Sequence, residues 1–293
     1  MELRTEFVGR RCRPLEIELT ARQIMNFAAG TADPNPCHLD DERPGGIIAP
    51  PMLATALTWN ISSRLAQFWE AEDFPAEVLT RQVHFSEILA CHRPMRPGDK
   101  LRIEGETKAI LPHRGGTHLI MEYRATGPDG QPVFSEFAGA LLRGVRCVGP
   151  GRGAEDIPPM PEPPEAGAPL WEKEIHIGPL DAHIYDACAD IHFPIHTSPA
   201  FAHAVKLPGT IYHGTATLSQ ALREIVAAEA NGDPGRVRQV GGYFAGMVPL
   251  NSSIRIQALA RIPEANGSLV HFSVLNQDAK HAIKNAWVRL NAG

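Results

Sequence analysis

Residues 32–38 read Ala-Asp-Pro-Asn-Pro-Cys-His, and this stretch decides how the rest of the chain is interpreted. Pro34 and Pro36 fix φ and remove two backbone donors, so we expect the segment to leave the preceding helix as a rigid loop. Such a loop holds a carboxyl group, Asp33, and an imidazole, His38, at a fixed separation. Paired proton transfer depends first on geometry of this kind. We therefore expect Asp33 and His38 to form a catalytic pair.

A helix is predicted on each side of this loop. Residues 20–23, Thr-Ala-Arg-Gln, form a capping-box pattern that opens the first helix, and Gly30 marks its end. The second helix is expected over 52–69, where leucine and isoleucine recur at helical spacing. Its aliphatic stripe predicts a buried helix that lies on a sheet.

The periodicity of the sequence then changes from helix to strand. Turn-rich breaks separate runs in which apolar and polar residues alternate, as in antiparallel strands. Helices followed by antiparallel strands indicate an α+β fold. The four predicted strands are 82–89, 100–110, 117–126 and 134–143.

The same pattern repeats after a proline-rich segment. Residues 149–169 contain seven prolines, which is typical of an extended linker. Beyond it, residues 190–196 (Asp-Ile-His-Phe-Pro-Ile-His) stand where the first loop stood, and a second buried helix is expected from 216 to 230. We therefore predict an N-terminal domain over 1–148, a linker over 149–170 and a C-terminal domain over 171–293.

Composition narrows the class of protein. The net charge is −5 at pH 7 and charged residues make up 21% of the chain, which does not favour a nucleic-acid partner. No apolar run approaches the roughly 20 residues of a membrane span, and we expect no membrane partner. The five cysteines are dispersed without C-x-x-C spacing, so we expect a reduced, cytoplasmic compartment.

The loop and its surroundings resemble the MaoC-like family of acyl-thioester dehydratases and (R)-specific enoyl-CoA hydratases. The family motif is Gly-Asp-x-Asn-Pro-x-His. Asp33, Asn35, Pro36 and His38 match it, whereas Ala32 replaces the leading glycine. The resemblance implies a hot-dog fold, in which an antiparallel sheet wraps one long helix. Two fused copies would form a double hot-dog.

The resemblance also implies a reaction, the reversible addition of water to an α,β-unsaturated acyl thioester, with acyl-CoA as substrate and no cofactor. Asn35 and Met52 are the expected substrate-binding residues. The reaction needs N–H donors for the thioester oxygen, and the start of a helix supplies them. Because residues 50 and 51 are both proline, Met52 is the first residue there that can donate.

The two halves do not carry the same residues. Aligning His38 with His196, 158 positions later, pairs Asp33 with Ile191 and leaves Asp190 one position out of register. The second half keeps a His-Gly turn where the first has two prolines. Its candidate site residues are His196, Asp190, His213, Gly214 and Ser219.

Several alternatives stay open at this point. Asp33 and Asn35 could be turn or cap residues, and His196 a structural histidine left by duplication. A metal site at His192 and His196 is disfavoured, because Pro194 between them breaks the helical spacing. A hot-dog thioesterase and a non-catalytic acyl-thioester-binding subunit are alternative functions. A homodimer also stays open, although the fused halves already supply the usual hot-dog pair.

Overall fold

A computed structural model describes residues 1–70, 73–165 and 167–293. Within these residues the strands form a ten-stranded antiparallel sheet and a separate two-stranded pair, β1 (Glu2–Arg4) with β7 (Arg146–Val148). Each half of the chain contributes five strands to the large sheet. They are β2 (Leu15–Glu18), β3 (Gln82–Cys91), β4 (Lys100–His113), β5 (Gly116–Thr126) and β6 (Pro132–Arg143), then β8 (Trp171–Ile177), β9 (Val237–Phe244), β10 (Ser252–Glu264), β11 (Gly267–Leu275) and β12 (His281–Asn291).

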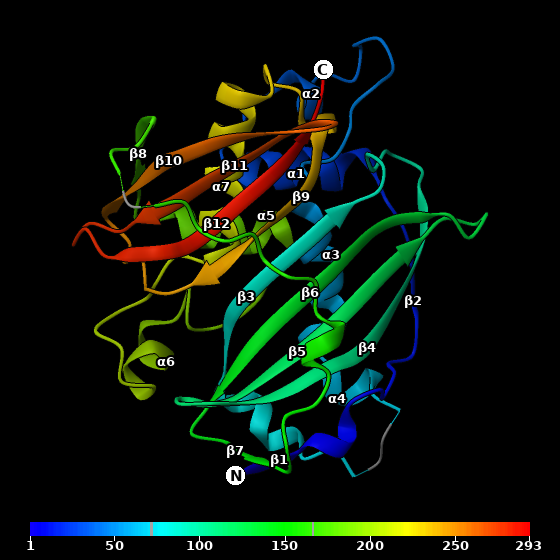
Figure 1. Cartoon of the computed structure of the whole chain (residues 1–293), viewed down its shortest axis with the longest axis vertical. Helices are drawn as coiled ribbons and strands as arrows, with labels where there is room; N and C mark the ends of the chain where they lie inside the picture. Colours follow the sequence, from blue (N-terminus) through cyan, green and yellow to red (C-terminus); the bar gives the residue numbers. More distant parts are fainter. Residues whose placement is uncertain (71–72, 166) are drawn as a thin grey trace.

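The strand order shows that the two halves are built alike. It runs β2-β4-β5-β6-β3 in the first half and continues β9-β12-β11-β10-β8 in the second. The halves meet where β3 pairs with β9, with Ser86 opposite Tyr243. Figure 1 shows the long helices behind this sheet. The helices are α1 (Ala21–Gly30), α2 (Pro36–Leu39), α3 (Leu53–Ser62), α4 (Leu65–Phe68), α5 (Asp181–Ala189), α6 (Pro199–Ala204) and α7 (Gly214–Glu229).

The capping signals predicted for the first helix are confirmed. The Thr20 hydroxyl accepts from Gln23 N–H at 3.2 Å, and the Gln23 side chain accepts from Thr20 N–H at 2.9 Å. The helix ends at Gly30, as expected. A side chain on Gly30 would collide with Cys188 of α5, at 2.7 Å. Gly30 therefore also permits the close crossing of α1 and α5.

The predicted strands are confirmed, with ends that differ by one to three residues. The helix predicted over 52–69 is divided instead into α3 and α4. Ser63 Oγ and Arg64 Nε both donate to main-chain carbonyls one turn earlier, and Arg64 leaves the α region with φ −124°. Side chains that bond to carbonyls of the preceding turn in this way destabilise and bend a helix.

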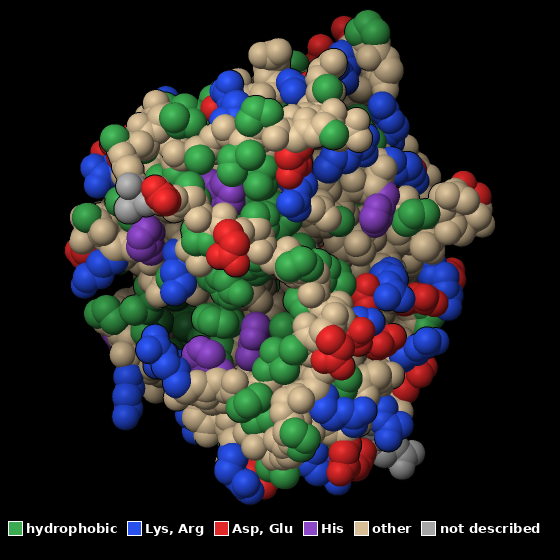
Figure 2. Space-filling view, viewed as in Figure 1, with side chains coloured by type: hydrophobic (Ala, Val, Ile, Leu, Met, Phe, Trp, Pro, Cys, Tyr) green, Lys and Arg blue, Asp and Glu red, His purple; other side chains and the backbone are tan. Residues whose placement is uncertain are grey.

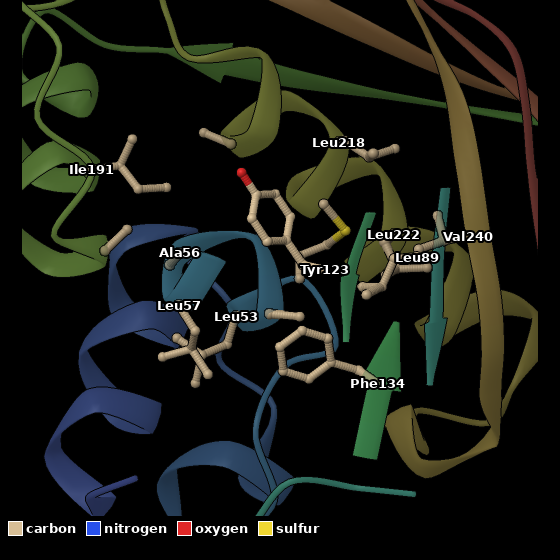
Figure 3. Close-up of a cluster of buried hydrophobic side chains, with 14 of the residues drawn as sticks. Leu53, Ala56, Leu57, Leu89, Tyr123, Phe134, Ile191, Leu218, Leu222 and Val240 are labelled. Carbon is tan, nitrogen blue, oxygen red and sulfur yellow. The ribbon is translucent and has the colours of Figure 1, made fainter. Parts of the chain in front are cut away.

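The core continues from one half to the other. Figure 3 shows Leu53 and Leu57 of α3, Leu218 and Leu222 of α7, and Leu89 and Val240 at the β3–β9 junction in one apolar cluster. Burying a side chain of this size contributes about 1.5–3 kcal/mol. The junction is therefore stabilised by core packing as well as by strand pairing.

The outer face of the first half is polar. Acidic and basic side chains intermingle over β4 and β5 (Figure 2), where Lys108 and Arg124 both pair with Glu122. Glu122 itself is only 7% exposed, so these two cations compensate a carboxylate that is largely removed from water. On the same sheet, Ile157 and Met160 of the linker cover Ile88 and Trp287, which face away from the helices. The domain limits at 148 and 171 stay a prediction.

None of the helices in the described part of the chain combines the length and apolarity that crossing a membrane requires.

Candidate active site

The segment that carries Asp33 begins with a left-handed turn at the end of α1. Ala32 has φ +51°, and the chain reverses there so that Asp33 N–H donates to Ala28 O at 2.8 Å. Bonds of this type close the C-terminus of a helix and favour glycine at the left-handed position. Pro36 then opens α2 at its first position, where its missing N–H costs nothing. The predicted loop thus contains one short helix.

Asp33 and Asn35 both act as turn residues. Asp33 Oδ1 accepts from Asn35 N–H at 3.0 Å, and Asn35 Oδ1 accepts from Cys37 N–H at 2.9 Å as the N-cap of α2. The Asn35 amide donates to Gly232 O of the second half at 2.7 Å. The turn interpretation is therefore true of both residues, but it leaves the second oxygen of Asp33 free for another contact.

That second oxygen faces His38. His38 Nε2 lies 3.5 Å from Asp33 Oδ2, and the two side chains are only 1% and 10% exposed. On the other side of the ring, Nδ1 lies 2.7 Å from Ile48 O. A carbonyl can only accept, so Nδ1 carries a hydrogen and Nε2 of the neutral ring keeps a lone pair directed at the carboxyl group. This arrangement suits general acid–base chemistry.

The pair borders a small cavity between the two halves. α7 forms the wall opposite Asp33 and His38. Of its wall residues the sequence predicted only Ser219, and as part of a separate second-half site. A neighbouring cavity shares Pro51 and Pro234 and contains Arg93 and Arg238. The first cavity is lined by Thr31, Asp33, His38, Pro50, Pro51, Met52, Ser219, Leu222, Arg223, Val226 and Pro234.

The start of α3 also faces this cavity. Leu53 N–H donates to Pro50 O and Ala54 N–H to Pro51 O, at 3.0 and 3.2 Å. Within the described residues, Met52 N–H has no main-chain acceptor. Since Pro50 and Pro51 have no N–H, Met52 offers the first backbone donor at this helix start.

The second half repeats the backbone of this site without its acid. Asp190 has φ +56° and so occupies the place of Ala32, and Ile191 N–H donates to Asp186 O as Asp33 N–H does to Ala28 O. Both equivalences keep the 158-residue spacing deduced from the histidines. The structure therefore sets Ile191 where the first half has Asp33. Asp190 lies on the surface and pairs with His192, 2.8 Å away.

His196, His213 and Gly214 are three further second-half candidates. His196 Nδ1 contacts Ile211 O at 2.9 Å, as His38 contacts Ile48, and its ring stacks on His213 at 3.7 Å. Burial lowers the pKa of His196 to about 4. Burial, and then the neighbouring His196, lower the pKa of His213 to about 2. Gly214 begins α7 against the ring of Phe244. Two stacked neutral imidazoles with no carboxyl group between them lack an acid–base partner.

Sequence reasoning missed the residues that α7 and its following loop bring to Asp33. Leu222, Arg223 and Val226 line the cavity, and Gly232 O binds Asn35. They lie nearly 200 residues from the loop, and no local motif marks them. Among the described residues, no group of three or more His, Cys, Asp or Glu side chains is placed to hold a metal ion.

Solved structures with a similar arrangement of strands and helices identify the fold. A MaoC-like dehydratase from Phytophthora capsici superposes with a TM-score of 0.80 over 98% of this chain and 97% of its own, at 16% identity. A Mycobacterium tuberculosis protein described as a double hotdog fold superposes with a TM-score of 0.64 over 97% and 96%, at 13% identity. The fold is a double hot-dog.

Sequence comparisons relate each half of the chain to a known domain. Residues 6–136 match the model of the FAS1-like dehydratase domain region, and residues 162–261 match the MaoC-like domain. The chain is 26% identical over 247 residues to a protein named enoyl-CoA hydratase ChsH3 from Mycobacterium tuberculosis, covering 82% of this chain and 83% of that one. The first half of the chain thus matches a dehydratase domain region and the second half a MaoC-like domain.

Proposed function

We propose that this chain is a hydro-lyase that adds water to, or removes it from, an α,β-unsaturated acyl-CoA. One observation carries the proposal: Asp33 Oδ2 and His38 Nε2 lie 3.5 Å apart, almost fully buried, beside a cavity between the halves. The name of the Mycobacterium tuberculosis relative, an enoyl-CoA hydratase, supports the same reaction class.

In the hydration direction, Asp33 Oδ2 and His38 Nε2 hold one water molecule, whose oxygen attacks the β-carbon. His38 Nε2 takes a proton from that water while the C–O bond forms. The electron pair of the C=C bond moves to the α-carbon and the thioester oxygen. The imidazolium then returns its proton from Nε2 to the α-carbon, which completes the addition of water. Both transfers reach the same face of the substrate, so the mechanism predicts syn addition.

The thioester oxygen carries negative charge in the transition state, and we assign Met52 N–H as its donor. This N–H begins α3, where the helix dipole favours an anion. The cavity that contains Asp33 and His38 includes Met52 in its wall. A single main-chain donor of this kind contributes roughly 10²–10³ in rate.

We assign the acyl chain to the α7 side of the cavity and the CoA moiety to the neighbouring one. Leu222 and Val226 supply apolar surface for an acyl chain. In the neighbouring cavity, Arg93 is bound in a bidentate pair to Asp99. Within the described residues, the one hydrogen bond found for the Arg238 side chain goes to His92 O, at 3.2 Å. Arg238 is therefore the cation we assign to a CoA phosphate.

This assignment gives the two predicted domains different tasks. Residues 1–148 carry the acid–base loop, and residues 171–293 supply α7 and close the acyl pocket. A homodimer stays a prediction.

The test is an assay of the purified chain on crotonyl-CoA and on longer trans-2-enoyl-CoA substrates. Hydration is followed as loss of the ultraviolet absorbance of the enoyl thioester, and hydrolysis as release of free thiol. Hydration without thiol release is the expected result. Asp33→Asn should lower kcat about 10²–10⁴-fold while preserving the acceptor for Asn35 N–H.

Asp190→Asn is the matched control, because it makes the same exchange at a surface acid of the other half, and it should retain activity. Thiol release that survives in Asp33→Asn would favour a thioesterase whose chemistry lies elsewhere. Binding of the substrate without either reaction would favour a non-catalytic subunit. Either result overturns the proposal.

A further inference from the structure

Arg223 joins the second half of the molecule to the turn that carries Asp33. Its side chain, 15% exposed, extends from α7 to the end of α1. Nη1 donates to Thr31 O at 2.9 Å and to Ala32 O at 2.6 Å, while Nε and Nη2 donate to Glu224 Oε1 at 2.9 and 2.6 Å. The guanidinium is thus held by its own helix on one edge and holds two carbonyls of the other half.

The carbonyls that Arg223 binds belong to a turn that an alanine does not favour. Ala32 has φ +51°, a left-handed conformation in which Cβ crowds the following carbonyl. Glycine adopts it without this cost. The next residue is Asp33, so relaxation of Ala32 toward the right-handed region would turn the carboxyl group away from His38. External hydrogen bonds to the turn oppose that relaxation.

The second half provides an internal comparison. The His38–Ile48 and His196–Ile211 contacts relate α3 to α7 by 163 positions, so Asn60 is the counterpart of Arg223. The Asn60 amide donates to Ala56 O and Leu57 O of its own helix, at 3.3 Å each. At the turn residue itself, Asp190 tolerates positive φ better than alanine does. Of the two equivalent turns, the one that an arginine of the other half binds is therefore the one that an acid follows.

We propose that Arg223 is a positioning residue that holds the Ala32 turn, so that Asp33 Oδ2 faces His38 Nε2. The role of this contact in catalysis rests on the proposed hydration reaction. The hydrogen bonds to the turn do not, and they can be tested on their own. Arg223 acts on the carboxyl group through the main chain, so its loss should lower kcat and leave KM nearly unchanged.

The experiment is a double-mutant cycle of Arg223→Met and Ala32→Gly. Arg223→Met should lower kcat about 10- to 100-fold, because a misplaced catalytic group costs up to about 100-fold. Ala32→Gly alone should stay within about 3-fold of the parent chain, and in Arg223→Met it should restore most of kcat, since glycine favours the turn by itself. Arg236→Met is the matched control, because Arg236 also binds a main-chain carbonyl, Asn291 O, but outside the site.

A second measurement separates this inference from the proposed function. Hydrogen exchange of the amides of residues 31–38 should accelerate in Arg223→Met and slow again in the double variant. If the parent chain hydrates no enoyl-CoA, the proposed function fails, and the exchange data still decide whether Arg223 holds the turn. A rise in KM that Ala32→Gly does not reverse would mean that Arg223 binds substrate directly. That result, or unchanged exchange, would overturn the inference.

Discussion

The two halves of this molecule end their first helix in the same left-handed turn and then diverge in chemistry. In the first half the turn residue is Ala32 and an acid follows it; in the second the turn residue is Asp190 and Ile191 follows it. Both histidines after the turn bind a main-chain carbonyl through Nδ1. The backbone of a site and its reactive groups can therefore be inherited separately. Five predictions test how far that separation goes.

The largest effect is expected from exchanging the equivalent histidines. His38→Gln should lower kcat/KM for enoyl-CoA hydration about 10²–10⁴-fold, because it removes the lone pair that faces Asp33. His196→Gln makes the same exchange in the second half and should change kcat/KM less than about 3-fold. Steady-state kinetics of both variants provide the comparison. Equal losses would mean that both histidines take part in the reaction.

A carboxyl group placed in the second half should reduce stability without adding activity. Ile191→Asp buries an acid beside His196 and His213, neither of which is protonated near pH 7. Burial of an uncompensated polar group should lower the free energy of unfolding by about 2–5 kcal/mol in urea denaturation. Ile191→Val is the matched control and should cost about 0.5–1.5 kcal/mol. Increased hydration in Ile191→Asp would show that the second half needs only the acid.

Buried histidines should make the protein lose stability as pH falls, and in both halves: burial lowers the pKa of His84 and His118 to about 4, as it does for His196. In the second half, the folded pKa of His196 is lowered to about 4, so the unfolded state binds more protons and stability falls as pH drops from about 6.5 toward 4. Urea unfolding of His196→Gln should show a smaller loss over this range than the parent chain does. An identical loss in both would contradict the assignment of this pH dependence to His196.

The first half should also weaken as pH rises. Burial raises the pKa of Glu87 to about 8, and that of Glu136 well above its usual value. The folded state then holds a proton that the unfolded state has lost, so stability falls between about pH 4.5 and 8. Glu87→Gln should flatten this part of the curve in urea unfolding measurements. A slope that persists in Glu87→Gln would assign it to other groups.

The smallest effect is expected at the turn itself. Ala32→Gly should raise the free energy of unfolding by about 0.5–1 kcal/mol, because glycine adopts the left-handed conformation without steric cost. Ala227→Gly, at an exposed position of α7, should lower it by about 1 kcal/mol. Thermal or urea unfolding measures both. A loss of stability in Ala32→Gly would show that the turn at Ala32 is not strained.

Much of this fold could be predicted from residue patterns. The Thr20 and Gln23 capping box, the alternation in the strands and the 158-residue spacing of the histidines each describe a local feature, and the structure agrees with them. The break after Ser62 was missed, because the apolar stripe continues while side chains compete for the backbone. Periodicity does not record that competition.

The candidate site was predictable only in part. Asp33 and His38 are five residues apart, so a motif contains both of them. Arg223 and Ser219 reach the same cavity from α7, and the association of the two halves, through the pairing of β3 with β9 and a shared core, brings that helix across. Ser219 drew attention as part of the second half, but it borders the first-half cavity. No local sequence motif identifies a residue that completes a site from the other, structurally similar half of the chain.

The most direct test of the account compares Asp33→Asn with His196→Ala on a single trans-2-enoyl-CoA, with kcat measured for both. We expect Asp33→Asn to abolish nearly all hydration and His196→Ala to retain most of it. Hydration that survives in Asp33→Asn but disappears in His196→Ala would place the chemistry in the other half of the molecule.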